Sequence, residues 1–204
     1  MNKRNKAFPF EEGFGRRIME RILIIGCSGS GKSTLARALR EKLGLPLVHL
    51  DQLWWKKGWK NVTREEFDSR LALALNMDQW IIDGNYSRTM EMRLEKCDTI
   101  IYLDFSRWTC LWGAVSRYLH NLGKVRPDMP AGCIERLDWD HLKFIWNFNK
   151  NNRIRNYTWI GKTKHAKAIV LKNRKEVRRF LETLCLQNRP GFCRGGCCLF
   201  VIFA

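Results

Sequence analysis

The chain has 204 residues, 45% of them hydrophobic, which is enough for one α/β domain with a sizeable core. Lysines and arginines number 37 against 20 acidic residues, so the net charge of +17 favours acidic partners such as nucleotides, phosphorylated compounds, nucleic acid or an anionic membrane. No apolar stretch reaches the roughly 20 residues of a membrane-spanning helix, and no signal-peptide core follows the N-terminus. The sequence therefore predicts a soluble, cytoplasmic protein without a membrane partner, whose 8 irregularly spaced cysteines are free thiols.

Two terminal stretches differ in composition from the rest, so the predicted domain covers 19–187. Residues 1–18 are basic, and two interpretations stay open for them: an extension from a misplaced start, or a disordered arm. Residues 188–204 hold clustered cysteines and then an apolar run. Two interpretations are open for these residues: a metal-binding or membrane-tethering tail, or translated sequence without a role. Three cysteines without histidine partners match zinc sites poorly, which favours the second interpretation.

Short apolar runs alternate with helical patterns along the domain. The first run, 22–25, leads into a glycine-rich stretch and a helical pattern over 32–43 with leucines every four residues. This alternation predicts parallel βαβ units and a doubly wound sheet covered by helices on both faces. Further strands are expected at 47–50, 80–82, 99–103 and 168–171, and further helices at 63–75, 87–95, 108–122, 139–151 and 174–186.

The glycine-rich stretch reads GCSGSGKST and matches the phosphate-binding pattern G-x-x-x-x-G-K-[ST]. Its glycines let backbone N–H groups approach a phosphate chain, and the N-terminus of the next helix adds partial positive charge. Lys32 is predicted to reach the β- and γ-phosphates of ATP or another nucleoside triphosphate, and the Ser33 hydroxyl to ligate Mg²⁺. The predicted nucleotide-binding loop consists of Gly26, Cys27, Ser28, Gly29, Ser30, Gly31, Lys32, Ser33 and Thr34.

Aspartates follow three of the predicted strands, where ligands of a doubly wound sheet bind. Asp51 ends the phrase VHLD, Asp83 belongs to IIDG, and Asp104 ends IYLD. Asp51 and Asp83 are predicted to hold waters around Mg²⁺, or to accept a proton from a substrate hydroxyl. Asp104 fits the cap of the following turn better than a place in the site.

The 9 tryptophans allow two interpretations, a stacking surface for single-stranded nucleic acid or core packing. Trp139, Leu142 and Trp146 repeat at helical spacing, which favours the core. A group that follows Asp51 is predicted to shape a pocket for a base or an apolar ring: Trp54, Trp55 and Trp59.

In the order GCSGSGKST, HLD, DGNYSR and YLDFSRW, these motifs resemble the P-loop kinases of the nucleoside-monophosphate kinase and shikimate kinase group. From 19 to 184 the chain is similar to small bacterial proteins of that group labelled DNA topology modulation proteins, with which it shares LPLVHLDQLWWKKGW and RPDMPAGC. The resemblance implies a three-layer P-loop NTPase fold. A five-stranded parallel sheet would be flanked by helices and would carry an acceptor-binding segment and a small lid.

The resemblance also implies roles for acidic and basic residues near the third strand. Asp51 corresponds to the acid that holds a magnesium water and faces the acceptor, and Asp83 to the acid of a D-G-x-x-R phrase. Arg88 would clamp the acceptor or transferred phosphate, although it stands five residues after Asp83, where that phrase places its arginine four residues on.

A second set of implied roles lies around the lid, expected at 123–133. Arg117, late in the preceding helix, would stack on adenine and meet phosphate. Arg153 and Arg155, expected after the next helix, would close onto the γ-phosphate, or would form a solvated basic run at a helix end.

Taken together, the residues favour an ATP- and Mg²⁺-dependent kinase that phosphorylates a small molecule, either a nucleoside monophosphate or a hydroxyl metabolite. For a hydroxyl acceptor, Asp51 is the candidate base. The alternative is an ATP-dependent nucleic-acid-binding regulator, which the charge and the family label support, but which lacks a recognisable reading module. A plain ATP hydrolase is disfavoured because no water-positioning residue can be assigned. The sequence indicates neither the acceptor nor the oligomeric state.

Overall fold

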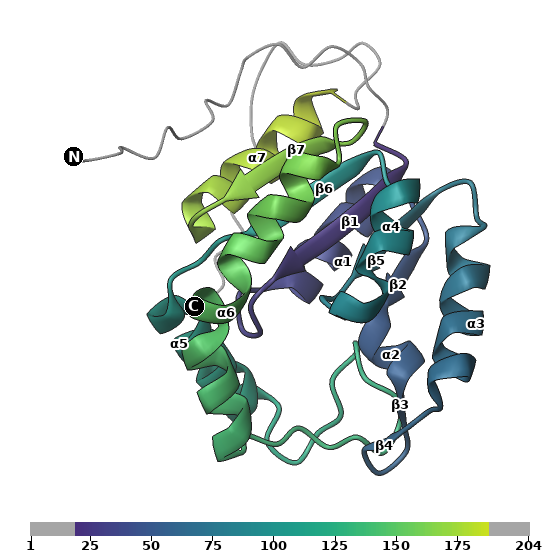
Figure 1. Cartoon of the computed structure of the whole chain (residues 1–204). Coiled ribbons are helices and arrows are strands. Elements are labelled where there is room, and N and C mark those ends of the chain that lie inside the picture. The colour runs from purple at the N-terminus through teal and green to yellow at the C-terminus, as the bar shows by residue number, and fades with distance from the viewer. Residues whose placement is uncertain (1–18, 188–204) are drawn as a thin grey trace.

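The computed structural model describes residues 19–187 and contains a five-stranded parallel sheet with helices on both faces (Figure 1). The strand order is β2-β5-β1-β6-β7, and every neighbouring pair is parallel. Such a sheet buries its strands on both faces, which explains their continuous apolar runs. The strands are β1 (Arg21–Gly26), β2 (Leu47–His49), β5 (Trp80–Asp83), β6 (Thr99–Leu103) and β7 (Lys167–Leu171).

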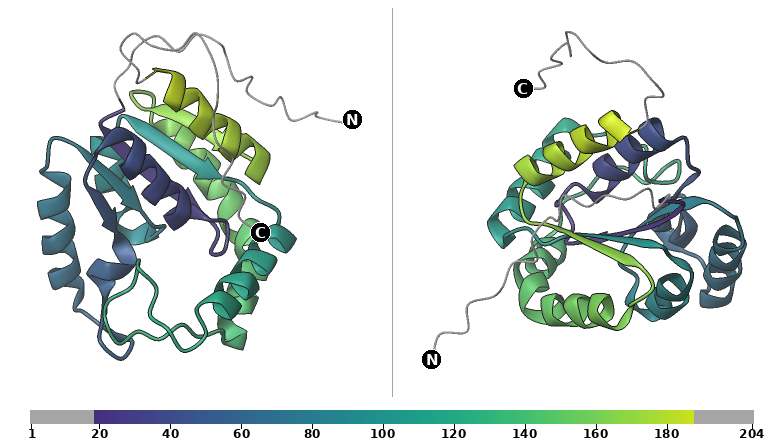
Figure 2. Two further views of the ribbon diagram at one scale, coloured as in Figure 1. Left: turned by 180° about the vertical axis from the view of Figure 1, so that it is seen from behind. Right: turned by 90° about the horizontal axis from the view of Figure 1, so that it is seen from above.

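Alternate side chains of the central strand β1 divide the core into two halves. Ile22 and Ile24 belong to the half that also contains apolar side chains of α1 and α7. Leu23 and Ile25 belong to the half that contains side chains of α3 and α4. Seen from above, these helices lie in two layers on either side of the sheet (Figure 2). Their bounds are α1 (Lys32–Leu43), α7 (Arg174–Gln187), α3 (Arg64–Leu75) and α4 (Met90–Lys96).

Two further helices, α5 (Arg107–His120) and α6 (Trp139–Lys162), pack against each other beside the sheet. The chain between them, residues 121–138, crosses to a small hairpin on the opposite side (Figure 1). There Gly58 N–H donates to the Gly132 carbonyl over 3.3 Å, which joins the two segments. The hairpin consists of β3 (Trp55–Lys56) and β4 (Lys60–Asn61), it follows α2 (Leu50–Trp54), and a short 3₁₀ turn, η1 (Ser87–Thr89), precedes α4.

The predicted fold class is confirmed, and so are the five predicted strands, each of whose ends agrees within one residue. The helix expected at 139–151 is wrong in length, because α6 continues to Lys162. The helix expected at 87–95 is divided into η1 and α4, and the hairpin β3–β4 was not predicted. The predictions for 1–18 and 188–204 lie outside the described residues.

The predicted burial of the α6 tryptophans is also wrong. Trp139 is 80% exposed and Trp146 is 40% exposed, since α6 turns Ile145 and Phe148 toward the core instead. The predicted free thiols are confirmed for the four cysteines whose side chains the structure describes, all of which are buried. Among residues 19–187, no helix is both long and apolar enough to cross a bilayer.

Candidate functional site

The glycine-rich loop joins the end of β1 to the start of α1 at the carboxyl edge of the sheet. Gly26, Gly29 and Gly31 have φ values of 150°, 77° and 93°, which residues with a Cβ rarely adopt. No side chain caps the first turn of α1, so its backbone N–H groups are available to an anion. Lys32 Nζ donates to the Cys27 carbonyl over 2.9 Å and therefore lies across the loop.

This loop packs directly against α5 through a second glycine, which the sequence reasoning did not single out. A Cβ on Gly113 would lie 2.1 Å from the Gly29 carbonyl oxygen, and a Cβ on Gly29 would lie 2.1 Å from the Cys110 carbonyl oxygen. Real Cβ atoms do not come this close, so both positions need glycine. The contact fixes the loop against the helix that carries Arg117.

Asp83, at the end of β5, lies beside the start of α1, where the glycine-rich loop ends. Its Oδ2 accepts a hydrogen bond from Ser33 Oγ over 2.7 Å and lies 3.0 Å from His49 Nδ1. Asp83 is only 5% exposed, and its other carboxylate oxygen has no hydrogen-bond partner among residues 19–187. An unpartnered buried carboxylate oxygen beside a serine hydroxyl suits a hard cation or its water. The residues present therefore fit Mg²⁺ at the predicted position.

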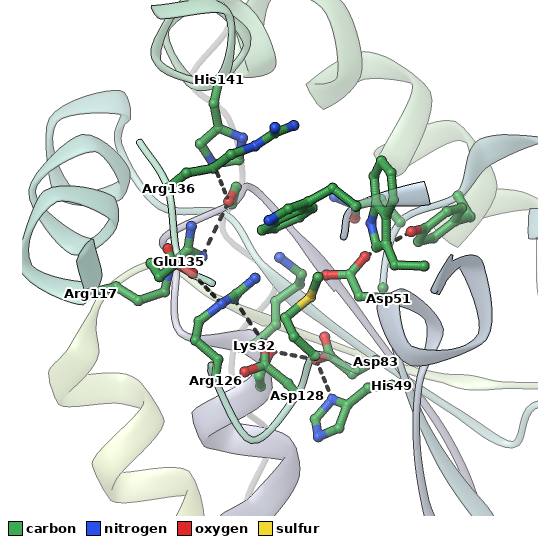
Figure 3. A pocket seen from close by; sticks show the side chains of 18 of the residues that line it. Lys32, His49, Asp51, Asp83, Arg117, Arg126, Asp128, Glu135, Arg136 and His141 are labelled. Carbon is green, nitrogen blue, oxygen red and sulfur yellow. Dashed lines mark hydrogen bonds and ion pairs between the residues drawn. The ribbon is translucent and has the colours of Figure 1, made fainter. Parts of the chain in front are cut away.

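Asp51, in the first turn of α2, lies on the same cavity. Tyr86 Oη donates to Asp51 Oδ1 over 2.8 Å (Figure 3). Burial raises the pKa of the Asp51 carboxyl, and the nearby charge of Asp83 raises it further, against the hydrogen bond from Tyr86, which lowers it. Burial and the Asp51 charge likewise raise the pKa of Tyr86 far above its usual range, so its hydroxyl remains a donor.

A buried arginine supports the segment that links these acids to the loop. Arg93 is fully buried and donates to the carbonyls of Gly84, Asn85 and Tyr86 over 2.7–2.8 Å. Burial lowers the pKa of Arg93 to about 9. The Asn85 side chain in turn bonds both the N–H and the carbonyl of Gly26, at 3.0 and 2.6 Å. Arg93 thus positions the loop through the backbone, and sequence reasoning missed it.

Arg88, the arginine that the sequence favoured, lies elsewhere. It forms a bidentate pair with Asp68 of α3 at 2.6 and 2.7 Å, and its side chain is 45% exposed. It does not line the cavity. The structure therefore brings Asp51 and Asp83 together and leaves Arg88 outside.

The opposite wall of the cavity is a network of ion pairs centred on Glu135. Arg117 Nε lies 2.9 Å from Glu135 Oε1, and Arg126 Nε lies 2.5 Å from Glu135 Oε2. Arg126 also pairs with Asp128 at 3.0 Å. Burial pushes the pKa of Asp128 up, but the Arg126 guanidinium, a backbone hydrogen bond and smaller contributions from His49 and Ser33 together hold that pKa below its ordinary value. The Glu135 side chain is 1% exposed, so its carboxylate is shielded from water, whereas the Arg117 side chain is 25% exposed.

This wall also contacts the glycine-rich loop. His141, on the first turn of α6, lies 3.0 Å from Ser28 Oγ (Figure 3). Burial and the positive charge of Arg117 lower the pKa of His141, which favours the neutral imidazole. Arg117 Nη1 lies 3.5 Å from Ser28 Oγ of the loop, although its closer partner is Glu135, and its predicted contact with the nucleotide stays a prediction.

Arg153 and Arg155 do not reach the cavity. The prediction that they follow a helix is wrong, because α6 includes both. Arg153 pairs with the buried Asp104 at 2.8 Å, and Tyr157 Oη donates to the same carboxylate over 2.8 Å. Arg155 bonds Asn152 and lies 5.0 Å from the Trp159 ring centroid. Asp104 is part of this separate cluster and is not a turn cap.

The resulting cavity has a volume of about 430 Å³ and opens between the sheet edge and residues 121–138. Asp51 and Asp83 lie on one side of Lys32, and Arg117 and Glu135 lie on the other (Figure 3). Of the three tryptophans predicted to shape a pocket, Trp55 and Trp59 line the cavity. Trp54 instead packs against Phe67, with the ring centroids 5.4 Å apart. The apolar lining consists of Trp55, Trp59, Met129 and Phe144.

Comparisons with known proteins give partial matches. A family model described as AAA domain matches residues 22–106. An uncharacterized AAA domain-containing protein, ycf46, from Gracilaria tenuistipitata var. liui is 42% identical over 52 residues, which are 25% of this chain and 11% of that protein. The chain thus matches only about a tenth of this curated relative's length.

Two solved shikimate kinases are similar to this chain in structure. The enzyme from Bacteroides thetaiotaomicron has a TM-score of 0.49 and 17% identity over 83% of this chain and 98% of its own. The Acinetobacter baumannii enzyme, in complex with shikimate, has a TM-score of 0.47 and 18% identity over 84% and 95%. The sequence resemblance to DNA topology modulation proteins stays a prediction.

Proposed function

We propose that the protein binds ATP with Mg²⁺ at residues 26–34 and transfers the γ-phosphoryl group to a small-molecule acceptor in the adjoining cavity. One observation carries the proposal: Ser33 and the unpartnered oxygen of Asp83 lie at the start of α1, on the cavity that Asp51 also lines. A phosphate-binding loop, a cation site and an acid at one cavity are the groups that phosphoryl transfer requires.

Each side chain has a defined task in this proposal. When bound, Mg²⁺ would neutralise charge on the phosphates, held by the Ser33 hydroxyl and by Asp83, directly or through water. Lys32 would leave the Cys27 carbonyl and bind the β- and γ-phosphates. The loop amides and the N-terminus of α1 would hold the rest of the phosphate chain. Arg117, beside Ser28, would contact the nucleotide, and Asp51 would face the acceptor.

The proposal is tested by labelling metabolites with γ-³²P-ATP. Lys32→Ala should reduce transfer by a factor on the order of hundreds, because the lysine would stabilise charge that develops in the transition state. Lys175→Ala, on the exposed side of α7, is the matched control and should leave transfer unchanged. Equal labelling by both variants and the native protein would point to a contaminating kinase and would contradict the proposal.

An ATP-dependent nucleic-acid-binding role has one observation in its favour. Trp108 and Trp112 of α5 are 68% and 71% exposed, and the Trp108 ring lies 5.0 Å from that of Trp146, over which Arg107 is placed at 4.9 Å. Exposed aromatic and cationic groups together suit the stacking of bases. If this surface binds single-stranded DNA, Trp108→Ala should lower the affinity in a filter-binding titration. Unchanged affinity would exclude the surface.

A further inference from the structure

We infer that the acceptor is an alcohol that carries no phosphate group and has a flat or apolar body, which excludes nucleoside monophosphates. The inference rests on the proposed function and selects one of the two acceptor classes that the sequence left open. It follows from the charges that line the cavity, from the partners of each arginine near it, and from the side chains on the hairpin side.

The described side chains that line the cavity provide no surplus of positive charge for a second phosphate group. Among residues 19–187, four cationic side chains line it, and Lys32 among them is needed for the phosphates of ATP. Five carboxylates from the same described part of the chain line this space, so these side chains carry one more negative than positive charge when histidines count as neutral. A second phosphate group, with its two negative charges, would enter an environment with no positive surplus. The five acids are Asp51, Asp83, Asp128, Glu135 and Asp138.

Each of the three cavity arginines also has a carboxylate partner. Arg117 and Arg126 share Glu135, and Arg126 also binds Asp128. Arg136 lies 3.6 Å from Asp138. If a phosphate drew Arg117 or Arg126 away, the shielded carboxylate of Glu135 would lose a partner, and an unpaired buried charge is strongly unfavourable. A phosphate-bearing acceptor would therefore have to break this network to be held.

The two arginines that lie nearest in sequence to Asp83, Arg88 and Arg93, do not supply the missing phosphate contacts. Arg88 already donates two hydrogen bonds, one from each terminal nitrogen, to the carboxylate of Asp68 on α3. Arg93 is fully buried, and its guanidinium binds backbone carbonyls that shape the site. Monophosphate recognition favours bidentate arginine contacts, and neither residue is placed to provide them.

The hairpin side of the cavity offers apolar contacts instead. Trp59 is fixed by its indole N–H, which donates to the Ile134 carbonyl over 3.0 Å, and by Arg136, which lies 4.7 Å from its ring centroid. Trp55 packs edge-on against Trp59 at 5.4 Å. Rigid aromatic walls of this kind hold flat or apolar groups. The acceptor's body would lie here, and its reacting oxygen would lie toward Asp51.

Phosphoryl transfer to such an alcohol forms one bond to phosphorus and breaks another. The acceptor oxygen forms a bond to the γ-phosphorus while the bond from that phosphorus to the β–γ bridging oxygen of ATP breaks, and ADP leaves with the electron pair. The acceptor's hydroxyl proton passes to the Asp51 carboxylate, whose Oδ1 accepts a hydrogen bond from Tyr86. The products are ADP and a phosphate ester.

The inference is tested with a protein-free metabolite extract of bacterial cells, divided in two. One half is treated with alkaline phosphatase, which is then removed by filtration, and the other half is left untreated. Both are incubated with the full-length protein, Mg²⁺ and γ-³²P-ATP, and labelled products are identified by mass. An alcohol acceptor predicts the same labelled ester, at undiminished yield, from both halves. Label that appears only in the untreated half would overturn the inference while leaving the proposed kinase function intact.

Calorimetry with ATP and Mg²⁺ on the same preparation separates the remaining outcomes. Binding of ATP without label in either half would contradict phosphoryl transfer, and with it both proposals. Absence of ATP binding would contradict the proposed function at its first step. Both of these results differ from a loss of label after phosphatase treatment, because that loss would contradict only the class of acceptor and not the kinase function.

A pair of tryptophan variants tests the apolar wall. Trp55→Leu should reduce formation of the labelled ester roughly tenfold or more, through a higher KM for the acceptor, with unchanged affinity for ATP. Trp139→Leu makes the same substitution at the start of α6, where the side chain is 80% exposed and does not line the cavity, and should change neither. Equal ester formation by both variants would overturn the assigned role of the wall, and retained ATP binding shows that each variant is folded.

Discussion

The two walls of the cavity are stabilised in different ways. The glycine-rich loop is held by backbone geometry, through positive φ angles, the start of α1 and the contact of Gly29 with Gly113. Residues 121–138 are held by side-chain ion pairs, with Glu135 between Arg117 and Arg126. The first wall is rigid because few conformations allow it. The second can reorganise, but only at the cost of separating buried charges.

The largest effect is expected from Glu135→Ala, which removes the centre of the ion-pair wall. Arg117 and Arg126 would lose their shared carboxylate inside the protein, so the free energy of unfolding should fall by roughly 3–5 kcal/mol. Urea denaturation measures this value. Glu66→Ala removes a carboxylate that is 33% exposed and also pairs with two cations, Lys56 and Arg70, and should cost far less. Similar losses in the two variants would contradict the importance of burial.

Gly113→Ala tests the backbone wall and should have the next largest effect. The added methyl group would overlap the Gly29 carbonyl, so the loop and α5 must separate, with a loss of roughly 1–3 kcal/mol in stability and weaker ATP binding. Gly161→Ala is the matched control. This glycine lies in α6 with no atom near its added Cβ, and alanine there should raise stability by about 1 kcal/mol or less. An unaffected Gly113 variant would show that the contact is not tight.

Asp51→Asn tests the pH dependence of the acid between the walls. Burial raises the pKa of Asp51, so its ionised form destabilises the folded protein above that pKa, and the penalty disappears as pH falls toward the unfolded value of about 3.9. The variant should therefore be more stable than the native protein at pH 7, and the difference should shrink at lower pH. Denaturant titrations at several pH values measure it.

Asp68→Asn should change the stability at pH 7 in the opposite direction to Asp51→Asn. Its hydrogen bond from Arg88 lowers the pKa of Asp68, so its ionised form stabilises the fold above the unfolded value, and this contribution is lost as pH falls through the lowered pKa. The variant should be less stable than the native protein at pH 7, and the deficit should shrink in acid. The same sign for both variants would contradict the assigned environments.

The smallest effect is expected from Arg88→Ala. This arginine pairs with Asp68 at the surface, so its loss should cost at most about 1 kcal/mol of stability and should leave phosphoryl transfer unchanged. The sequence motif, by contrast, places Arg88 on a phosphate and predicts a large loss of transfer. The labelling assay with ATP and metabolites therefore decides between the motif and the structure at this residue.

Sequence reasoning succeeded where a local pattern determines the structure. The order of strands and helices, the glycine-rich loop and the acids at strand ends follow from residues close together in the chain, and Asp83 lies beside Ser33 as the motif suggests. It failed where partners are distant in sequence. No residue near Glu135 in the sequence indicates that it lies between Arg117 and Arg126. The need for glycine at position 113 likewise becomes evident only from its contact with Gly29 in the structure.

The arginines show the same division. Arg88 and Arg93 are both near Asp83, and spacing favoured the first, but only the packed structure reveals that Arg93 is buried against the backbone of the site. Charge alone could not identify it, because arginines are frequent throughout this basic chain. The phrase DGNYSR contained a further signal, since Asn85 and Tyr86 bind Gly26 and Asp51.

The central claim is that the loop amides, Ser33 and Asp83 form a site for ATP with magnesium. Calorimetry of the full-length protein with ATP, with and without Mg²⁺, tests it most directly. We expect saturable binding that strengthens when Mg²⁺ is present and that is weakened by Asp83→Asn, which removes the carboxylate beside Ser33. No detectable binding of ATP by folded protein at millimolar concentration, with or without the metal, would contradict the account.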